Sequence, residues 1–383
     1  MKYLPDRFNR LPQHQVINRI LDAAMQAANP ARAVKNYVHL RANILTVDDT
    51  EYNLQCFSKI WVIGIGKASI AMTESLSYIL GERLTGGVVI PKHLPQAAGL
   101  PESIVVVPGS HPIPGARSIQ AADEIIDLIP KIQPDDLVFC LISGGGSSLV
   151  TAPRSMIRLE DIQVVTDLLL SCGASIHEMN CIRKHLDRIK GGGLARLIAP
   201  TRMITLILSD VLDNSLDVIA SGPTVCDPTT YLDAYSFINK YQLFEKIPIV
   251  IREVLQSGIE GKIEETVKPG DPVLKAVSNI MVGSNYLAAS SALRQARADK
   301  LNSLLLTSFM QGEAREIGGL LGAICRQIAI SEEPVKAPAC IILGGETTVT
   351  IKGDGIGGRN LETAMGAIKP MQGLEHCILI TLA

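Results

Sequence analysis

The feature that most constrains this chain is an apolar run that ends in three consecutive glycines. Residues 137–143 read Leu-Val-Phe-Cys-Leu-Ile-Ser, a composition typical of a strand buried on both faces of a parallel sheet. Glycines expose their main-chain N–H groups, and neighbouring serines add hydroxyl donors. We therefore interpret the turn as an anion-binding site, with a flexible strand-to-helix turn as the alternative. Its residues are Ser143, Gly144, Gly145, Gly146, Ser147 and Ser148.

The order of strand, turn and helix recurs along the chain. Short apolar runs at 61–66, 87–90, 104–108 and 203–209 alternate with segments of helical periodicity. This repetition is typical of a doubly wound α/β domain, which binds ligands at the carboxyl ends of its parallel strands.

A chain of 383 residues favours two domains. Between 241 and 273 the strand pattern is replaced by charged segments of helical periodicity, interrupted by Pro248, Pro269 and Pro272. Predicted strands follow again at 280–285, 302–308, 339–344 and 347–351. We expect an N-terminal α/β domain at 1–245, a connecting segment at 246–274 and a C-terminal α/β domain at 275–383. Because residues 376–383 form a bare apolar strand, we expect a chain truncated at its C-terminus.

Composition argues against several kinds of partner. Lys and Arg number 36 against 38 Asp and Glu, and no basic stripe occurs, so nucleic acid is not an expected partner. The eight cysteines include no Cys-x-x-Cys pair, which disfavours a zinc site or a disulfide framework. With neither a signal peptide nor an apolar run of membrane-spanning length, the sequence predicts a cytoplasmic protein without a membrane partner.

Two cations follow glycine-rich turns. Lys67 comes directly after Gly64-Ile-Gly66, and Arg359 begins a predicted helix after a loop with four glycines. Each can be a surface charge, or it can bind a substrate carboxylate or a transferring phosphoryl group. A cation at a helix N-terminus is electrostatically unfavourable without an anion nearby, which favours a functional role for Arg359.

Other charged residues have weaker signals. Asp210 ends a predicted strand and Glu346 follows Gly345, so each can coordinate Mg²⁺, act as a base or merely cap a helix. The cluster of Lys184, His185 and Lys190 is more typical of a solvated helix face than of a site. Two catalytic or cofactor-binding motifs are incomplete or missing. Ser69 stands where a dinucleotide-binding fingerprint has its third glycine, and the Gly-x-Ser-x-Gly nucleophile elbow of hydrolases does not occur.

Six motifs in order resemble the glycerate 2-kinase family, which pairs a glycerate-kinase N-terminal domain with a MOFRL domain. The resemblance runs from about residue 24 to the end of the chain, and some members of that family are labelled hydroxypyruvate reductases. The motifs are VIGIGKASIAM, GSHPIPG, LISGGGSSL, IRKHLDRIKGGGLA, LSDVLDNSLDVIASGPT and GGETTVTIKGDGIGGRNLE.

The resemblance implies two α/β domains with an active-site cleft between them, and ATP- and Mg²⁺-dependent phosphorylation of D-glycerate at its 2-hydroxyl. The family's invariant Lys and Arg fall on Lys67 and Arg359. Asp210 or Glu346 would hold Mg²⁺, and the triple-glycine turn would hold phosphates. Seven residues are expected to contact or support the substrate, and all but Asn285 lie in these motifs: Lys184, Lys190, Ser221, Gly222, Thr224, Asn285 and Asn360.

The chain departs from the family pattern in three places. Leu361 stands where the family usually has Gln, Ser148 stands where it has Ala, and the family continues past residue 383.

Two other functions remain open from the sequence. One is an NAD(P)H-dependent hydroxypyruvate reductase that uses Gly64–Ser69 as a degraded dinucleotide loop. The other is a non-catalytic protein that binds a small anion. The oligomeric state, monomer or homodimer, is also left open.

Overall fold

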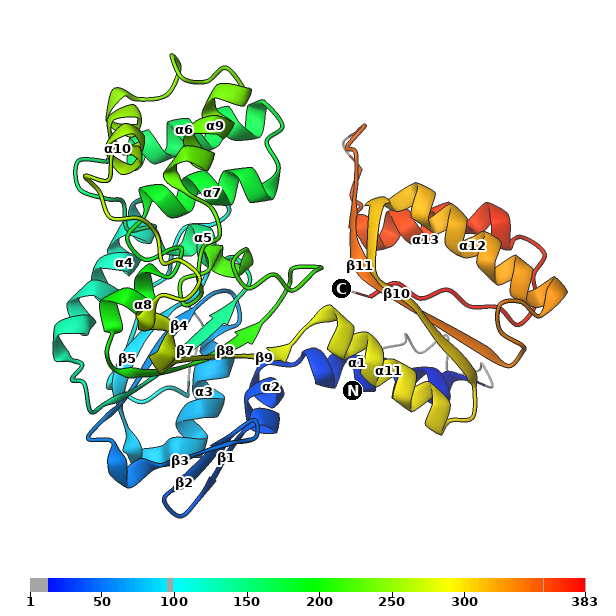
Figure 1. The fold of residues 1–383 in the computed structure, drawn as a ribbon. Coiled ribbons are helices and arrows are strands. Elements are labelled where there is room, and N and C mark those ends of the chain that lie inside the picture. Colours follow the sequence, from blue (N-terminus) through cyan, green and yellow to red (C-terminus); the bar gives the residue numbers. More distant parts are fainter. Residues whose placement is uncertain (1–12, 95–98, 354, 383) are drawn as a thin grey trace. The chain divides into compact units, whose positions relative to one another are not determined.

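The computed structural model describes residues 13–94, 99–353 and 355–382. The chain divides into two compact units (Figure 1). The larger unit is continuous and covers 30–283. The smaller unit combines residues up to 29 with those from 284 onward.

This division differs from the sequence-based domains. Residues 246–283 belong to the larger unit, because helix α10 (Ile249–Ile259) packs in its interior and strand β9 (Val277–Gly283) is part of its sheet. Residues 13–29 belong to the smaller unit, since α1 (His14–Ala28) packs on α11 (Asn285–Ala298) and Arg19 bonds to Asp299 at 2.6 Å. Both domain boundaries are therefore determined by contacts between residues that are distant in sequence.

A six-stranded parallel sheet forms the centre of the larger unit. Its spatial order is β6-β5-β4-β7-β8-β9, so the chain first builds outward in one direction and then switches to the other side of β4. This order is that of a doubly wound sheet, the fold class predicted from the sequence, and its switch point lies between β4 and β7. The remaining strands are β4 (Ile60–Ile65), β5 (Leu84–Ile90), β6 (Ile104–Val106), β7 (Leu137–Ser143) and β8 (Arg202–Leu208).

Two apolar cores cover the two faces of this sheet. In β7, Val138, Cys140 and Ile142 enter one core, whereas Leu137, Phe139 and Leu141 enter the other. Side chains alternate across a strand, so a strand that is apolar at every position must be covered on both sides. The covering elements are α2 (Pro30–Tyr37), α3 (Ser69–Leu80), α4 (Ala116–Leu128), α8 (Gly193–Ile198) and the antiparallel strands β1 (Val38–Arg41), β2 (Ile44–Val47) and β3 (Thr50–Asn53).

A helical cluster with its own core completes the larger unit (Figure 1). Tyr231, Ile238 and Leu255 are fully buried within it. Its helices are α6 (Leu159–Ser171), α7 (Ile176–Leu186), α9 (Tyr231–Lys240) and α10. Short helical turns in this unit are η2 (Leu54–Cys56), η3 (Gly81–Arg83), η4 (Ile129–Lys131), α5 (Gly146–Leu149), η5 (Ile219–Ser221) and η6 (Pro272–Ala276).

The smaller unit is also α/β, with a parallel pair of strands, β10 (Asn302–Glu313) and β11 (Ala339–Thr348). Helices α12 (Ala314–Ser331) and α13 (Arg359–Met371) pack together beside this pair. The separate strand predicted at 347–351 is wrong, because β11 runs through Glu346 and ends at Thr348. The strand predicted at 376–383 is wrong over its described part, since residues 376–382 pair with no strand.

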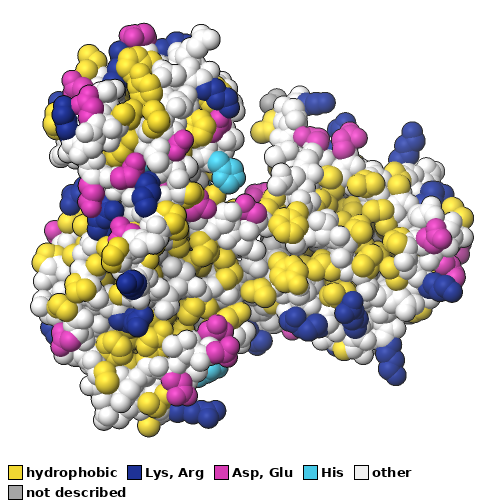
Figure 2. All heavy atoms as spheres, viewed as in Figure 1, with side chains coloured by type: hydrophobic (Ala, Val, Ile, Leu, Met, Phe, Trp, Pro, Cys, Tyr) yellow, Lys and Arg dark blue, Asp and Glu magenta, His cyan; other side chains and the backbone are white. Residues whose placement is uncertain are grey.

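On the face drawn in Figure 2, Lys and Arg side chains are interspersed with Asp and Glu. Within the described residues, no helix combines the length and apolarity needed to cross a membrane.

Candidate functional site

The turns that follow β4 and β7 meet at the switch point of the larger unit. The main-chain N–H of Lys67 donates to the carbonyl oxygen of Gly144 at 3.0 Å, and the N–H of Ala68 donates to Ser143 Oγ at 2.9 Å. Gly66 donates its N–H to Ile90 at the end of β5, also at 3.0 Å. Because ligands of open α/β sheets bind at this point, the two predicted motifs occupy one candidate site.

The triple-glycine turn has a sharply bent backbone. Gly145 has φ +85°, in the left-handed region, and α5 begins at Gly146. A Cβ placed on Gly145 would lie 3.0 Å from His111 Cδ2 and 3.1 Å from Lys67 Cε. Both side chains therefore face the same glycine, and only glycine combines this φ with such close neighbours.

Asp210 lies against the same turn. It follows β8 and is exposed, and a Cβ on Gly144 would overlap its carboxylate. In the described part of the chain, its carboxylate makes no hydrogen bond or ion pair. The predicted association of Asp210 with the turn thus has a geometric basis. An exposed carboxylate is a ligand type that suits Mg²⁺, which proteins usually hold through one or two carboxylates and substrate phosphates.

His111 is a site residue that the sequence did not single out, although it lies in the GSHPIPG motif. Burial lowers its pKa below the usual value, and the charges of Lys67 and Lys92 lower the pKa further. Its Nδ1 is buried without a hydrogen-bond partner in the described structure. Sequence reasoning missed it because a histidine in a proline-containing loop has no periodic signature.

Hydrogen bonds of Ser147 and of the 220–224 segment hold the triple-glycine turn in place. Ser147 Oγ and Ser221 Oγ lie 2.7 Å apart, and Ser221 Oγ donates to Asn180 Oδ1 at 3.1 Å. Ser221 is fully buried, so it positions the turn rather than facing a ligand. Gly222 accepts from Gly192 N–H at 2.7 Å, and Thr224 Oγ1 donates to Asn279 Oδ1 at 2.7 Å.

The basic cluster on α7 is not a solvated face, so that interpretation is wrong. Lys184 is 2% exposed and pairs with Asp217 at 3.0 Å and Asp227 at 3.3 Å. Lys190 is 4% exposed and lies 2.5 Å from Asp187 Oδ2 and 2.8 Å from the carbonyl of Val150. Asp217 and Asp227, distant in sequence, neutralise Lys184, whereas Asp187, three residues earlier, neutralises Lys190. Both lysines are structural ion-pair members.

The other predicted residues belong to the smaller unit. Arg359, the first residue of α13, forms a short ion pair with Glu346, and both side chains are about half exposed. Glu346 thus supplies an anion beside this helix N-terminus. Asn285 Nδ2 donates to the Ser308 carbonyl at 3.2 Å, and the Asn360 carbonyl accepts from Thr381 Oγ1 at 3.0 Å.

The structure therefore gathers Lys67, the triple-glycine turn and Asp210 within one unit, and it gathers Arg359 and Glu346 within the other. The two proposed metal ligands, Asp210 and Glu346, lie in different units. Among the described residues, no three His, Cys, Asp or Glu side chains form a metal cluster.

Comparisons with known proteins match both parts of the chain. The model described as Domain of unknown function (DUF4147) matches residues 16–256, and the MOFRL family model matches residues 339–383. A glycerate 2-kinase from Pyrococcus horikoshii is 38% identical over 94% of this chain and 80% of its own length. A D-glycerate 2-kinase from Thermotoga maritima is 34% identical with the same two coverages.

A solved structure agrees with these matches. The crystal structure of a glycerate kinase from Thermotoga maritima superposes with a TM-score of 0.81 at 32% identity, over 94% of this chain and 80% of that one. The resemblance drawn from six sequence motifs is thereby confirmed. By its sequence, its domains and its fold, this chain belongs to the glycerate 2-kinase family.

Proposed function

We propose that the protein catalyses ATP-dependent phosphorylation of D-glycerate at its 2-hydroxyl, giving 2-phosphoglycerate and ADP. In this reaction the hydroxyl oxygen bonds to the γ-phosphorus, the bond from that phosphorus to the β–γ bridging oxygen breaks, and the hydroxyl loses its proton. The observation that carries the proposal is the meeting of Lys67 with the triple-glycine turn at the switch point. Family membership supports it.

The residues of the switch point suit phosphoryl transfer, which depends mainly on positioning and charge neutralisation. The exposed ammonium of Lys67 can neutralise phosphoryl oxygens, and the main chain of the turn at Gly145 can approach them closely because no Cβ intervenes. When bound, Mg²⁺ would neutralise phosphate charge, and Asp210 is the carboxylate of this unit placed to hold it. In the smaller unit, Arg359 is the residue that we propose binds substrate or phosphoryl oxygens.

The reductase alternative has less support. In enzymes that bind NAD at a switch point, an acid at the end of the second strand accepts the ribose hydroxyls. Here β5 ends at Ile90, and Pro91 and Lys92 follow. The first turn also has Ser69 in place of the third glycine of the fingerprint.

Phosphorus NMR tests the proposal. The protein is incubated with ATP, Mg²⁺ and D-glycerate, and Lys67→Ala serves as the matched control. We expect a new phosphomonoester signal from 2-phosphoglycerate with the unmodified protein but not with Lys67→Ala. A 3-phosphoglycerate signal would keep the kinase activity but contradict the position of transfer. No transfer, together with oxidation of NADH on addition of hydroxypyruvate, would favour the reductase.

A further inference from the structure

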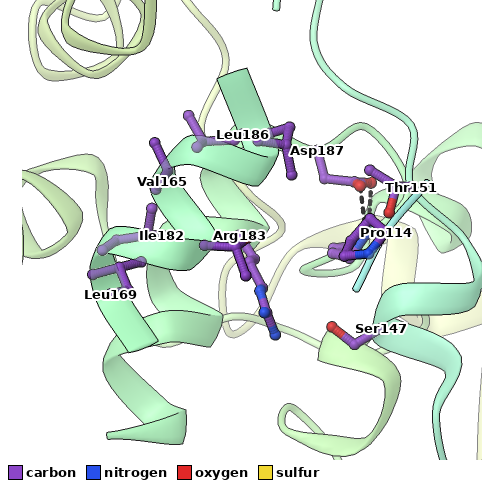
Figure 3. A pocket seen from close by; sticks show the side chains of 12 residues that line it. Pro114, Ser147, Thr151, Val165, Leu169, Ile182, Arg183, Leu186 and Asp187 are labelled. Atoms are coloured by element: carbon purple, nitrogen blue, oxygen red, sulfur yellow. Dashed lines mark hydrogen bonds and ion pairs between the residues drawn. The ribbon is translucent and has the colours of Figure 1, made fainter. Parts of the chain in front are cut away.

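A small pocket opens beside the triple-glycine turn, within the larger unit (Figure 3). One wall consists of apolar side chains of α6 and α7. The polar lining includes Ser147, Thr151, Asp187, Lys190 and also Arg183 of α7. Figure 3 shows Arg183 extending from α7 towards the segment that carries Ser147. The pocket thus places a guanidinium next to the turn that the proposed function assigns to phosphates.

The pocket has an uncompensated positive charge. Asp187 is its carboxylate, but four donors already occupy its oxygens: the main-chain N–H groups of Ala152, Ile189 and Lys190 at 3.0, 2.8 and 3.2 Å, and Lys190 Nζ at 2.5 Å. Among the described residues, Arg183 has no hydrogen bond or ion pair. With two cations and one saturated anion, the pocket lacks one negative charge.

The energetics of Arg183 agree with a missing anion. Burial lowers its pKa below the usual value, and the pKa of Lys190 is lowered chiefly by burial, with the charge of Arg183 adding to the effect. An arginine stays charged in proteins, so the energetic cost of burying it remains until an anion is bound.

A second polar group in the wall lacks a partner. Thr151 is 3% exposed and its Oγ1 is buried without a hydrogen bond in the described structure. A buried hydroxyl left unpaired costs free energy that a bound ligand can recover. Arg183 and Thr151 are therefore two hydrogen-bond donors that line one pocket and have no acceptor in the described structure.

We propose that Arg183 binds the carboxylate of D-glycerate in this pocket, assisted by the hydroxyl of Thr151. The inference rests on the proposed function. The two ends of the turn differ: Asp210 lies at Gly144, whereas Arg183 lies near Ser147. An acid repels a bare carboxylate but suits a phosphate with its cation, while an unpaired guanidinium fork matches a planar carboxylate.

The test compares Arg183→Gln with Arg188→Gln, which removes an exposed arginine five residues later on the same segment. In steady-state kinetics, Arg183→Gln should raise KM for D-glycerate about 10- to 100-fold and leave KM for ATP unchanged. Arg183→Lys keeps the positive charge but loses the two-pronged guanidinium, so its KM for D-glycerate should lie between those of the unmodified protein and Arg183→Gln. Thr151→Val should raise KM for D-glycerate a few-fold. Thermal melts check that every variant folds.

Calorimetry with D-glycerate and with its methyl ester, which lacks the carboxylate charge, supplies a readout independent of turnover. The unmodified protein should bind the acid at least ten times more tightly than the ester, and Arg183→Gln should abolish this preference. A rise in KM for ATP alone would overturn the inference and assign Arg183 to the nucleotide. An unchanged acid preference, or no binding of D-glycerate by the unmodified protein, would also overturn it.

The two proposals can fail separately. If no phosphoryl transfer occurs but acid binding depends on Arg183, the carboxylate site stands and the kinase proposal fails. If transfer occurs and Arg183→Gln has unchanged kinetics, the kinase proposal stands and the carboxylate site fails.

Discussion

The main-chain N–H of Lys67 donates a 3.0 Å hydrogen bond to the carbonyl oxygen of Gly144. This bond ties the turn after β4 to the turn after β7, two neighbouring strands at the centre of the sheet. Because the bond uses only main-chain atoms, it does not depend on the lysine side chain. The ammonium is left exposed and free to act on a ligand.

Lys67→Ala should therefore lower kcat/KM for phosphoryl transfer by about 100- to 1,000-fold, because a positioned charge that stabilises the transferring group is lost. The melting temperature should stay within about 2 °C, since the bond to Gly144 remains. Lys131→Ala is the control and should have unchanged kinetics, because Lys131 is exposed and lies before β7, whereas the turn follows the other end of that strand. A near-normal rate for Lys67→Ala would remove this residue from the mechanism.

Gly145→Ala should abolish activity and destabilise the protein. Gly145 has φ +85°, and its new Cβ would meet His111 and Lys67 at about 3 Å. Gly173→Ala is a matched control because Gly173 has φ +74° with nothing within 4 Å. Both variants should have the backbone cost of about 1–2 kcal/mol, but the control should keep its kcat. Equal loss of kcat in the two would show that crowding at the turn is irrelevant.

The imidazole of His111 should report on the charge of Lys67. Burial lowers the pKa of His111 most, and the neighbouring ammonium of Lys67 lowers the pKa further by opposing the imidazolium. Removing that positive charge in Lys67→Ala should raise the pKa of His111, though burial keeps it below the usual value. NMR titration measures this, with His111→Gln to assign the signal among seven histidines. An unchanged pKa of His111 in Lys67→Ala would show that the charge of Lys67 does not act on His111.

Glu178 should contribute stability that depends on pH. A hydrogen bond from Lys240 at 2.6 Å is the main reason that its pKa falls to about 2, with bonds from Ser175 and Tyr241 adding to it. Because the folded pKa is lowered, the contribution is complete above the unfolded value of 4.5 and is lost as the pH falls through about 2.

Glu178→Gln should consequently lower the melting temperature by about 2–4 °C at pH 7, equivalent to about 1 kcal/mol, since Lys240 is largely exposed. The difference from the unmodified protein should shrink as the pH falls from about 5 to 2. Glu253→Gln, at an exposed residue of α10, is the control and should melt normally at every pH. A constant difference across this range would contradict the assigned cause.

Local patterns were sufficient to predict the sheet of the larger unit. Residues 137–143 and 203–208 are apolar at nearly every position, and this pattern identifies strands covered on both faces. The pattern could not predict which unit β9 joins, because its register with β8 depends on residues about 70 positions away. Likewise, the pairing of α1 with α11 has no local signature.

The candidate site divides in the same way. Lys67 and the triple-glycine turn each follow a predicted strand, and ligands of parallel sheets bind at such strand ends, so both could be selected as candidates from the sequence. Lys184 was misread because Asp217 and Asp227, which neutralise it, lie 33 and 43 residues away. Arg183 lies in the IRKHLDRIKGGGLA motif, but nothing in the sequence distinguishes it from its basic neighbours. Its importance comes from the absence of a partner in the described structure, which only coordinates can show.

The discontinuous make-up of the smaller unit sets an order of events during synthesis. Residues 30–283 form one uninterrupted stretch, and its two ends are neighbours, since a Cβ on Gly283 would lie 3.9 Å from that of Ala33. On the ribosome this stretch can fold as soon as it has emerged. Among the described helices α1 is made first, but its packing partner α11 is made some 250 residues later. The first helix of the described residues can therefore pack only after the whole larger unit has been synthesised.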